Sequence, residues 1–107
     1  MEKVIRNGEV AVLVSPGYGA GWYTWNTEHP ECLFDPEIVE AVLAKKSVDY
    51  IAALAEAKWN TGGYYFYAGG AGDLIVEWLP IGTRFQIDEY DGYESLYTAD
   101  KQVWMVA

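Results

Sequence analysis

DLIVEWLPIGTRFQIDEYDGYESLYT, residues 73–98, is the stretch that decides the fold of this sequence. It contains three runs of strand-forming residues, separated by turn signals at Pro80-Ile81-Gly82-Thr83 and at Asp91-Gly92. Three strands joined by short turns are typical of an antiparallel meander. The two-residue turn also fixes the register of the last two strands, because it places Tyr90 opposite Tyr93.

The two faces of this predicted hairpin differ in character. Phe85, Ile87 and Leu96 share one face, which we expect to be buried. The other face is acidic and rich in tyrosine, and it comprises Gln86, Asp88, Tyr90, Tyr93, Ser95 and Tyr97. If this face is exposed, its rings and carboxylates predict a surface that attracts Arg and Lys side chains of a protein partner. If it packs against the terminal strands instead, the same rings belong to the core.

Glu89 and Glu94 face each other next to the turn, on the side of the predicted core. Like charges at facing positions repel each other unless a cation or a shifted pKa relieves them. Because the sheet ends here, we favour the interpretation that both carboxylates point into water. Recognition of a cation or of Arg and Lys is the second interpretation, and acid–base catalysis by the paired carboxylates is the third.

Composition limits the classes of partner. The 107 residues predict one domain, residues 1–107, and they carry 7 Lys and Arg against 16 Asp and Glu, a formal charge of −9. Nucleic acids and anionic membranes are bound through clusters of Lys and Arg, so we expect neither as a partner. A basic protein surface fits this charge, although the acidic excess can also serve solubility alone. Since the sequence starts without a signal-peptide pattern and holds no apolar run of about 20 residues, we expect a cytoplasmic protein.

The remaining elements predict an α+β fold. Asn7-Gly8 is a strong hairpin signal within residues 2–15, and the apolar strand Val10–Val14 is expected to be covered on both faces. One helix is expected from Asp35-Pro36-Glu37 to about Lys45-Lys46, and a second from Ser47 to about Trp59. Further strands are expected over residues 64–67, 74–79 (a central strand) and 101–106. The prediction is therefore a twisted antiparallel sheet, made of an N-terminal hairpin plus a C-terminal meander, with two short helices packed on one face.

Residues 15–26, SPGYGAGWYTWN, form the most unusual loop of the chain. Its glycines do not follow the spacing of phosphate-binding loops, and no helix pattern follows at once. A structural loop with a sharp bend is the first interpretation, and a loop that contacts a ligand or partner is the second. In the second case, aromatic residues around this loop and the glycine-rich residues 68–72 would bind a nucleotide or a sugar. These residues are Tyr18, Trp22, Trp25, Tyr64 and Tyr67.

His29 and Cys32 are the only residues of their kinds. A lone cysteine excludes an internal disulfide framework. A structural zinc site needs four ligands, and a catalytic thiolate–imidazole pair needs an oxyanion hole and an orienting group. We therefore expect no metal, no cofactor and no catalytic residues.

In character, this compact, strongly acidic chain, rich in Tyr and Trp and without a catalytic motif, resembles small proteins encoded by phages and prophages. Some of these inhibit bacterial defence nucleases, as anti-CRISPR proteins do. The resemblance implies a stoichiometric, non-enzymatic binder that covers a basic surface or sequesters a small signal. We expect the partner-binding residues to be Asp88, Tyr90, Asp91, Tyr93, Glu94 and Tyr97. The tyrosine face and an unpaired sheet edge also leave self-association into a homo-oligomer open.

Overall fold

The computed structural model describes residues 1–61, 63, 65–101 and 105–107. Within these ranges, two α-helices and five strands in two antiparallel sheets confirm the predicted α+β class. The strands are β1 (Ile5–Arg6), β2 (Glu9–Val14), β3 (Ile75–Pro80), β4 (Phe85–Tyr90) and β5 (Tyr93–Thr98). The helices are α1 (Pro36–Leu43) and α2 (Val48–Trp59), and short 3-10 helices span Tyr23–Trp25, Pro30–Leu33, Gly69–Asp73 and Ala99–Lys101.

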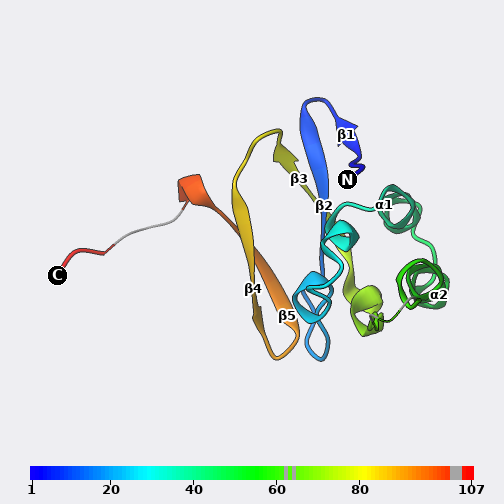
Figure 1. Ribbon diagram of the computed structural model, residues 1–107. Helices are drawn as coiled ribbons and strands as arrows, with labels where there is room; N and C mark the ends of the chain where they lie inside the picture. The colour runs from blue at the N-terminus through cyan, green and yellow to red at the C-terminus, as the bar shows by residue number, and fades with distance from the viewer. Residues whose placement is uncertain (62, 64, 102–104) are drawn as a thin grey trace.

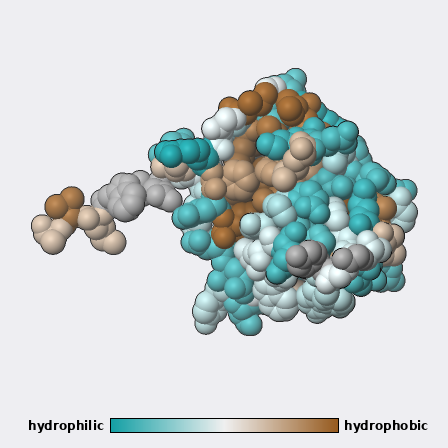
Figure 2. Space-filling model, in the orientation of Figure 1, coloured by the Kyte–Doolittle hydropathy of each residue, from teal (hydrophilic) through white to brown (hydrophobic). Residues whose placement is uncertain are grey.

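The elements form three layers, with β2 at the centre (Figure 1). The two helices lie on one side of the sheet β1-β2-β3, and the β4–β5 hairpin lies on the other. Alternation along β2 explains this, because Ala11 and Leu13 pack into the cluster on the helix side, while Val12 and Val14 pack with Ile87 and other residues of the hairpin side. These four residues of β2 are all buried, which confirms that this part of the strand is covered on both faces. Figure 2 shows hydrophobic surface remaining visible near the junction of the hairpin with the other layers.

The registers of both predicted hairpins are confirmed. Ile5 pairs with Val10 across the Asn7-Gly8 turn, and Tyr90 pairs with Tyr93 across the Asp91-Gly92 turn. In both turns the first residue has positive φ, 52° at Asn7 and 50° at Asp91, as a type I′ turn requires. Two-residue turns of this type set the pairing locally, without help from the rest of the chain.

The predicted three-stranded meander is wrong in one respect. β3 pairs along its whole length with β2, from Glu9↔Pro80 to Val14↔Ile75, so it is an edge strand of the first sheet and not a central strand. The turn at residues 80–83 then carries the chain to the second sheet, where β4 and β5 pair with each other. Apolar residues occur on both faces of β3 because its side chains pack into the hydrophobic clusters on both sides of the sheet. They do not indicate that β3 has a neighbouring strand on each side.

Both helices begin at the predicted caps. The carboxylate of Asp35 accepts a hydrogen bond from the Ile38 N–H at 3.1 Å, and the Ser47 hydroxyl accepts one from the Tyr50 N–H at 3.1 Å. α2 is the longer of the two at 12 residues. Within the described ranges, no helix has both the length and the apolar character needed to cross a membrane.

Two predicted strands are not found. Residues 65–67 are irregular, and Tyr64 lies outside the described residues. The backbone of Tyr67 pairs with a side chain and not with a strand: its N–H donates to Asn26 Oδ1 at 2.7 Å, and its carbonyl accepts from Asn26 Nδ2 at 2.9 Å. In the predicted strand 101–106, Lys101 ends a 3-10 helix, Met105 and Val106 are exposed and irregular, and residues 102–104 lie outside the described residues.

Candidate functional site

Glu94 anchors the tip of the hairpin from the inside. Its side chain is 1% exposed, and its carboxylate accepts four hydrogen bonds. Oε1 accepts from the Ser15 N–H at 2.9 Å, and Oε2 accepts from the N–H groups of Trp22 at 2.9 Å and Thr24 at 3.0 Å. The Thr24 hydroxyl donates to the same Oε2 at 2.6 Å. The prediction that Glu94 is exposed and contacts a partner is therefore wrong, because the glycine-rich loop surrounds its carboxylate.

The loop of residues 15–26 wraps around the hairpin tip and has the structural role that the first interpretation gave it. The Gly19 N–H donates to the Asp91 carbonyl at 2.8 Å, and the Glu94 N–H donates to the Ser15 carbonyl at 3.0 Å. Gly92 adopts a φ of +83°, and a Cβ at this position would lie 2.3 Å from the backbone nitrogen of Ala20. Glycine is needed at position 92 because loop and turn touch backbone to backbone.

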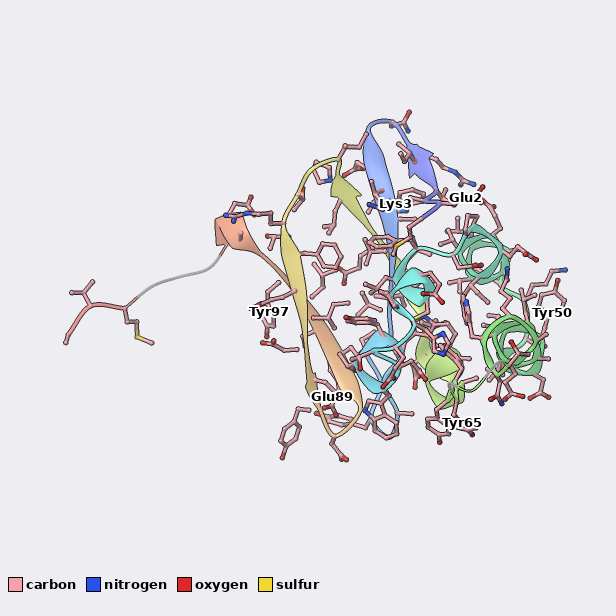
Figure 3. All side chains as sticks on the ribbon, viewed as in Figure 1. Glu2, Lys3, Tyr50, Tyr65, Glu89 and Tyr97 are labelled. Atoms are coloured by element: carbon pink, nitrogen blue, oxygen red, sulfur yellow. The ribbon has the colours of Figure 1, made fainter. Side chains whose placement is uncertain are left out.

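Glu89, the cross-strand neighbour of Glu94, has a different environment. It is exposed, and its Oε2 accepts a hydrogen bond from the Gly92 N–H at 2.6 Å. The Glu94 carboxylate is therefore sealed inside the protein. The Glu89 carboxylate lies at the surface (Figure 3). The pair does not present two carboxylates to one open site, so the acid–base interpretation of Glu89 and Glu94 fails.

The outer face of the hairpin is open to solvent, as one of the two sequence interpretations required. Tyr90 is 78% exposed and Tyr97 is 48% exposed, and Asp88 and Asp91 are also exposed. Tyr93 is half-buried because the ring of Tyr18 packs on it, with centroids 5.1 Å apart. Figure 3 shows Tyr97 on the side of the hairpin away from the helices. Sequence reasoning missed that Tyr18 joins this face, because the loop reaches the turn only in the folded chain.

A hollow of about 150 Å³ lies on this outer face. Its lining consists of four tyrosines, two acidic residues and a serine: Tyr18, Asp88, Glu89, Tyr90, Tyr93, Ser95 and Tyr97. We call this feature the tyrosine hollow. Asp91 does not line it, although it lies in the adjoining turn. The arrangement offers aromatic faces and negative charge to the same incoming group.

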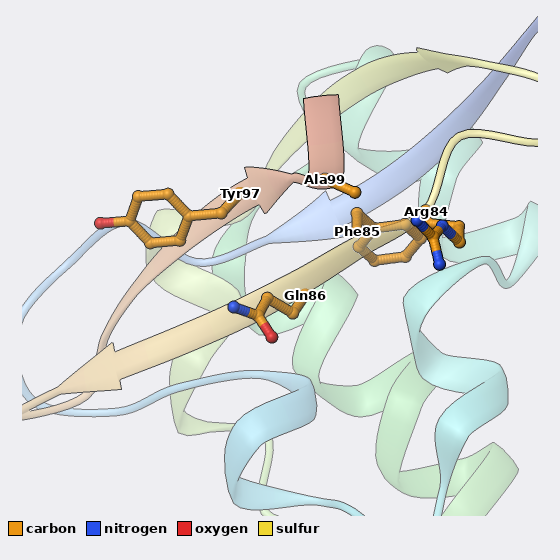
Figure 4. A pocket seen from close by; sticks show the side chains of 5 residues that line it. All are labelled: Arg84, Phe85, Gln86, Tyr97 and Ala99. Atoms are coloured by element: carbon orange, nitrogen blue, oxygen red, sulfur yellow. The ribbon is translucent and has the colours of Figure 1, made fainter. Parts of the chain in front are cut away.

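A second hollow, of about 260 Å³, adjoins the first at Tyr97 (Figure 4). Its lining residues are Arg84, Phe85, Gln86, Tyr97 and Ala99. Alternate residues along a strand point to the same face, so Arg84 falls on the face of Gln86 and Asp88. This alternation is the sequence signal that could have identified Arg84 as a residue of the outer face. Because Arg84 and Asp88 lie on either side of Tyr97, the sign of the charge changes along the outer face.

The aromatic residues of the alternative ligand site do not converge. Trp22 is fully buried in the core, and its Nε1 donates to the Cys32 carbonyl at 2.8 Å. Trp25 stacks on Tyr67 at 5.6 Å, both partly exposed, whereas Tyr18 belongs to the tyrosine hollow. Tyr64 lies outside the described residues. A single pocket lined by these rings is therefore contradicted.

His29 and Cys32 are both buried, and His29 Nδ1 lies 3.3 Å from a Glu31 carboxylate oxygen. Burial raises the pKa of the Cys32 thiol far above its ordinary value, and the negative charge of Glu31 adds to this. The thiol is thus held in its protonated, unreactive form. In the described part of the chain, no group of three or more His, Cys, Asp or Glu side chains is placed to hold a metal ion.

Fold and surface together define a small α+β domain whose last hairpin is anchored from within and presents an acidic, tyrosine-rich outer face. No family model, curated protein or solved structure matches the chain. The functional argument therefore depends on this surface alone.

Proposed function

We propose that this protein is a non-enzymatic, cytoplasmic binding protein that docks on a basic protein surface through the outer face of β4–β5. The observation that carries the proposal is the exposure of Asp88, Tyr90, Asp91 and Tyr97 side by side on one hairpin. Glu94 leaves this set, and Tyr18 joins it through its contact with Tyr93.

Charge favours a basic partner. The formal charge of the chain is −9, and neither Asp88 nor Asp91 has an ion pair or a side-chain hydrogen bond within the described residues. A positively charged surface would gain these carboxylates as new partners, and the long-range field would speed its approach.

The anchored tip favours tight docking. Four hydrogen bonds to Glu94 and two backbone bonds between loop and hairpin hold the outer face in one conformation. Tyrosine side chains add contact area at low entropic cost, since they have few rotatable bonds. A preordered face loses less entropy on binding than a flexible one.

The resemblance in character to phage-encoded inhibitors supports a more specific version of the proposal. In this version the basic partner is the nucleic-acid-binding surface of a bacterial defence nuclease, and the protein acts by covering that surface stoichiometrically. An acidic face is suited to this role because it occupies the place of phosphates.

The test compares affinities of the purified partner nuclease for variants of equal net charge. The double variant Asp88→Asn/Asp91→Asn removes two charges from the outer face, and Asp49→Asn/Glu56→Gln removes two from α2, on the opposite side of the molecule. Losing two pairs of about 0.5–1 kcal/mol each predicts weakening of about 5- to 30-fold for the hairpin variant. The α2 variant should stay within about twofold of wild type at 150 mM salt, a physiological ionic strength.

Salt dependence is the second readout. Affinity of the wild type should fall steeply as salt is added, and the hairpin variant should show a smaller slope. Equal affinities of wild type and hairpin variant, or equal weakening by both double variants, would overturn the proposal. A partner lost only from the α2 variant would place the interface elsewhere.

A further inference from the structure

The tyrosine hollow gathers rings and carboxylates without a cation. Four of its seven lining residues are tyrosines and two are acidic, and none is Lys or Arg. Asp88 has no ion pair or hydrogen bond from its side chain among the described residues, and Glu89 uses only one oxygen, on the Gly92 N–H. At least three carboxylate oxygens are thus open to an incoming donor.

Among the described residues, the Lys and Arg side chains that contact aromatic rings lie outside the tyrosine hollow. Lys3 lies 4.6 Å from the centre of the Phe34 ring, and Lys46 lies 5.4 Å from that of Tyr50. Arg6 lies 5.7 Å from a ring centre of Trp78 and also pairs with a carboxylate of α1. In the described chain, each of these rings already has its cation, whereas the ring-rich and acidic hollow has none. Arg84 lines the neighbouring hollow and not this one, so the tyrosine hollow is open to a cation from another molecule.

We propose that the tyrosine hollow is a binding site for one arginine side chain of the partner protein. This inference rests on the proposed function and specifies its central contact. The guanidinium group would stack on the rings of Tyr90 and Tyr97 and donate hydrogen bonds to Asp88, with Glu89 as a second acceptor.

Size and chemistry favour arginine over lysine. A hollow of about 150 Å³ has the volume of roughly five liquid water molecules, which is ample for a planar guanidinium group. Guanidinium stacks on aromatic faces, donates two parallel hydrogen bonds to one carboxylate, and gives up water more readily than an ammonium group. Lysine supplies only a compact, strongly hydrated charge, so rings contribute less to its binding.

The experiment uses three small probes and NMR spectra of the whole protein. N-acetyl-argininamide, N-acetyl-lysinamide and N-acetyl-citrullinamide are titrated while the ring signals of Tyr90, Tyr93 and Tyr97 are followed. The citrulline compound matches arginine in shape but has no charge. We expect saturable shifts at these rings with the arginine compound, binding at least about threefold weaker with the lysine compound, and no saturation with the citrulline compound.

Matched variants distinguish binding inside the tyrosine hollow from attraction by the overall negative charge of the protein. Asp88→Asn should weaken the arginine probe about fivefold, whereas Asp91→Asn, which removes the same charge just outside the hollow, should change it by less than twofold. Tyr97→Phe keeps the ring and should bind as wild type does, whereas Tyr97→Leu should lose about threefold. All three positions changed are exposed, so the four variants are expected to fold, and their amide spectra check this.

The site is refuted if the arginine probe leaves the three rings unshifted, if citrulline binds equally, or if Asp88→Asn and Asp91→Asn weaken it equally. Such a result leaves the proposed function standing when the partner nuclease still discriminates the hairpin variant from the α2 variant. The opposite pattern, a specific arginine site in a protein whose partner ignores the hairpin charges, would overturn the proposed function and with it the partner as the source of the arginine, while the hollow would still be an arginine site.

Discussion

Replacing Glu94 with glutamine tests the idea that one buried carboxylate holds the hairpin against the glycine-rich loop. The amide oxygen can take the place of Oε2 and keep its three donors, but as neutral acceptor it loses about 1 kcal/mol on each. The amide NH₂ then faces the Ser15 N–H, a buried donor that loses its partner at a cost of about 1–3 kcal/mol. Removing a buried charge offsets part of this loss. We expect a net destabilisation of about 3 kcal/mol.

A loss of this size is easily measured. For a domain of about 100 residues, 1 kcal/mol shifts Tm by about 4–8 °C, so Glu94→Gln should lower Tm by about 12–24 °C. Urea unfolding followed by tryptophan fluorescence gives the free energy directly. Glu89→Gln is the matched control, because the same chemical change occurs directly across the strands at an exposed side chain with one hydrogen bond. It should cost no more than about 1 kcal/mol, and equal losses for both variants would refute the reasoning.

Three further predictions concern the fold. Gly92→Ala should destabilise the protein by about 2 kcal/mol or more, because its Cβ would meet the Ala20 backbone, whereas Gly8→Ala, with similar φ but open space, should cost less; thermal unfolding of both variants decides. The buried Cys32 thiol should react with a thiol reagent at pH 8 only as fast as the protein unfolds, and rapid labelling of the native protein would contradict its burial. Ser47→Ala should cost about 1 kcal/mol in urea unfolding through loss of the α2 cap, and Ser47→Asp should restore most of it.

Features set by neighbouring residues could be predicted from the sequence. The turns at Asn7-Gly8 and Asp91-Gly92 fix their registers, and Asp35 and Ser47 cap their helices, because each signal acts within a few residues. The same register also predicted which residues share the outer face of the hairpin.

Features that depend on distant partners were missed. Glu94 is separated by 79 positions from Ser15 and by 72 from Trp22, and no local pattern reveals that these backbone N–H groups meet its carboxylate. The irregular segment around Tyr67 likewise depends on Asn26, 41 positions away, whose amide takes the place of a neighbouring strand. The sequence did hold one signal. Glu94 is two residues from Leu96, so both side chains point to the core face, and Glu94 had to be buried or lie at the end of the sheet.

The register that buries Glu94 is also the register that builds the outer face. Side chains alternate along β5, so Glu94 and Leu96 point inward while Tyr93 and Tyr97 point outward. A slip of one residue would exchange the two sets, moving the carboxylate away from its donors and the rings away from solvent. The four hydrogen bonds to Glu94 therefore stabilise one register against its neighbours as well as the loop against the hairpin. Anchor and binding face are consequences of a single turn, so weakening the anchor should also loosen the surface that we propose as the interface.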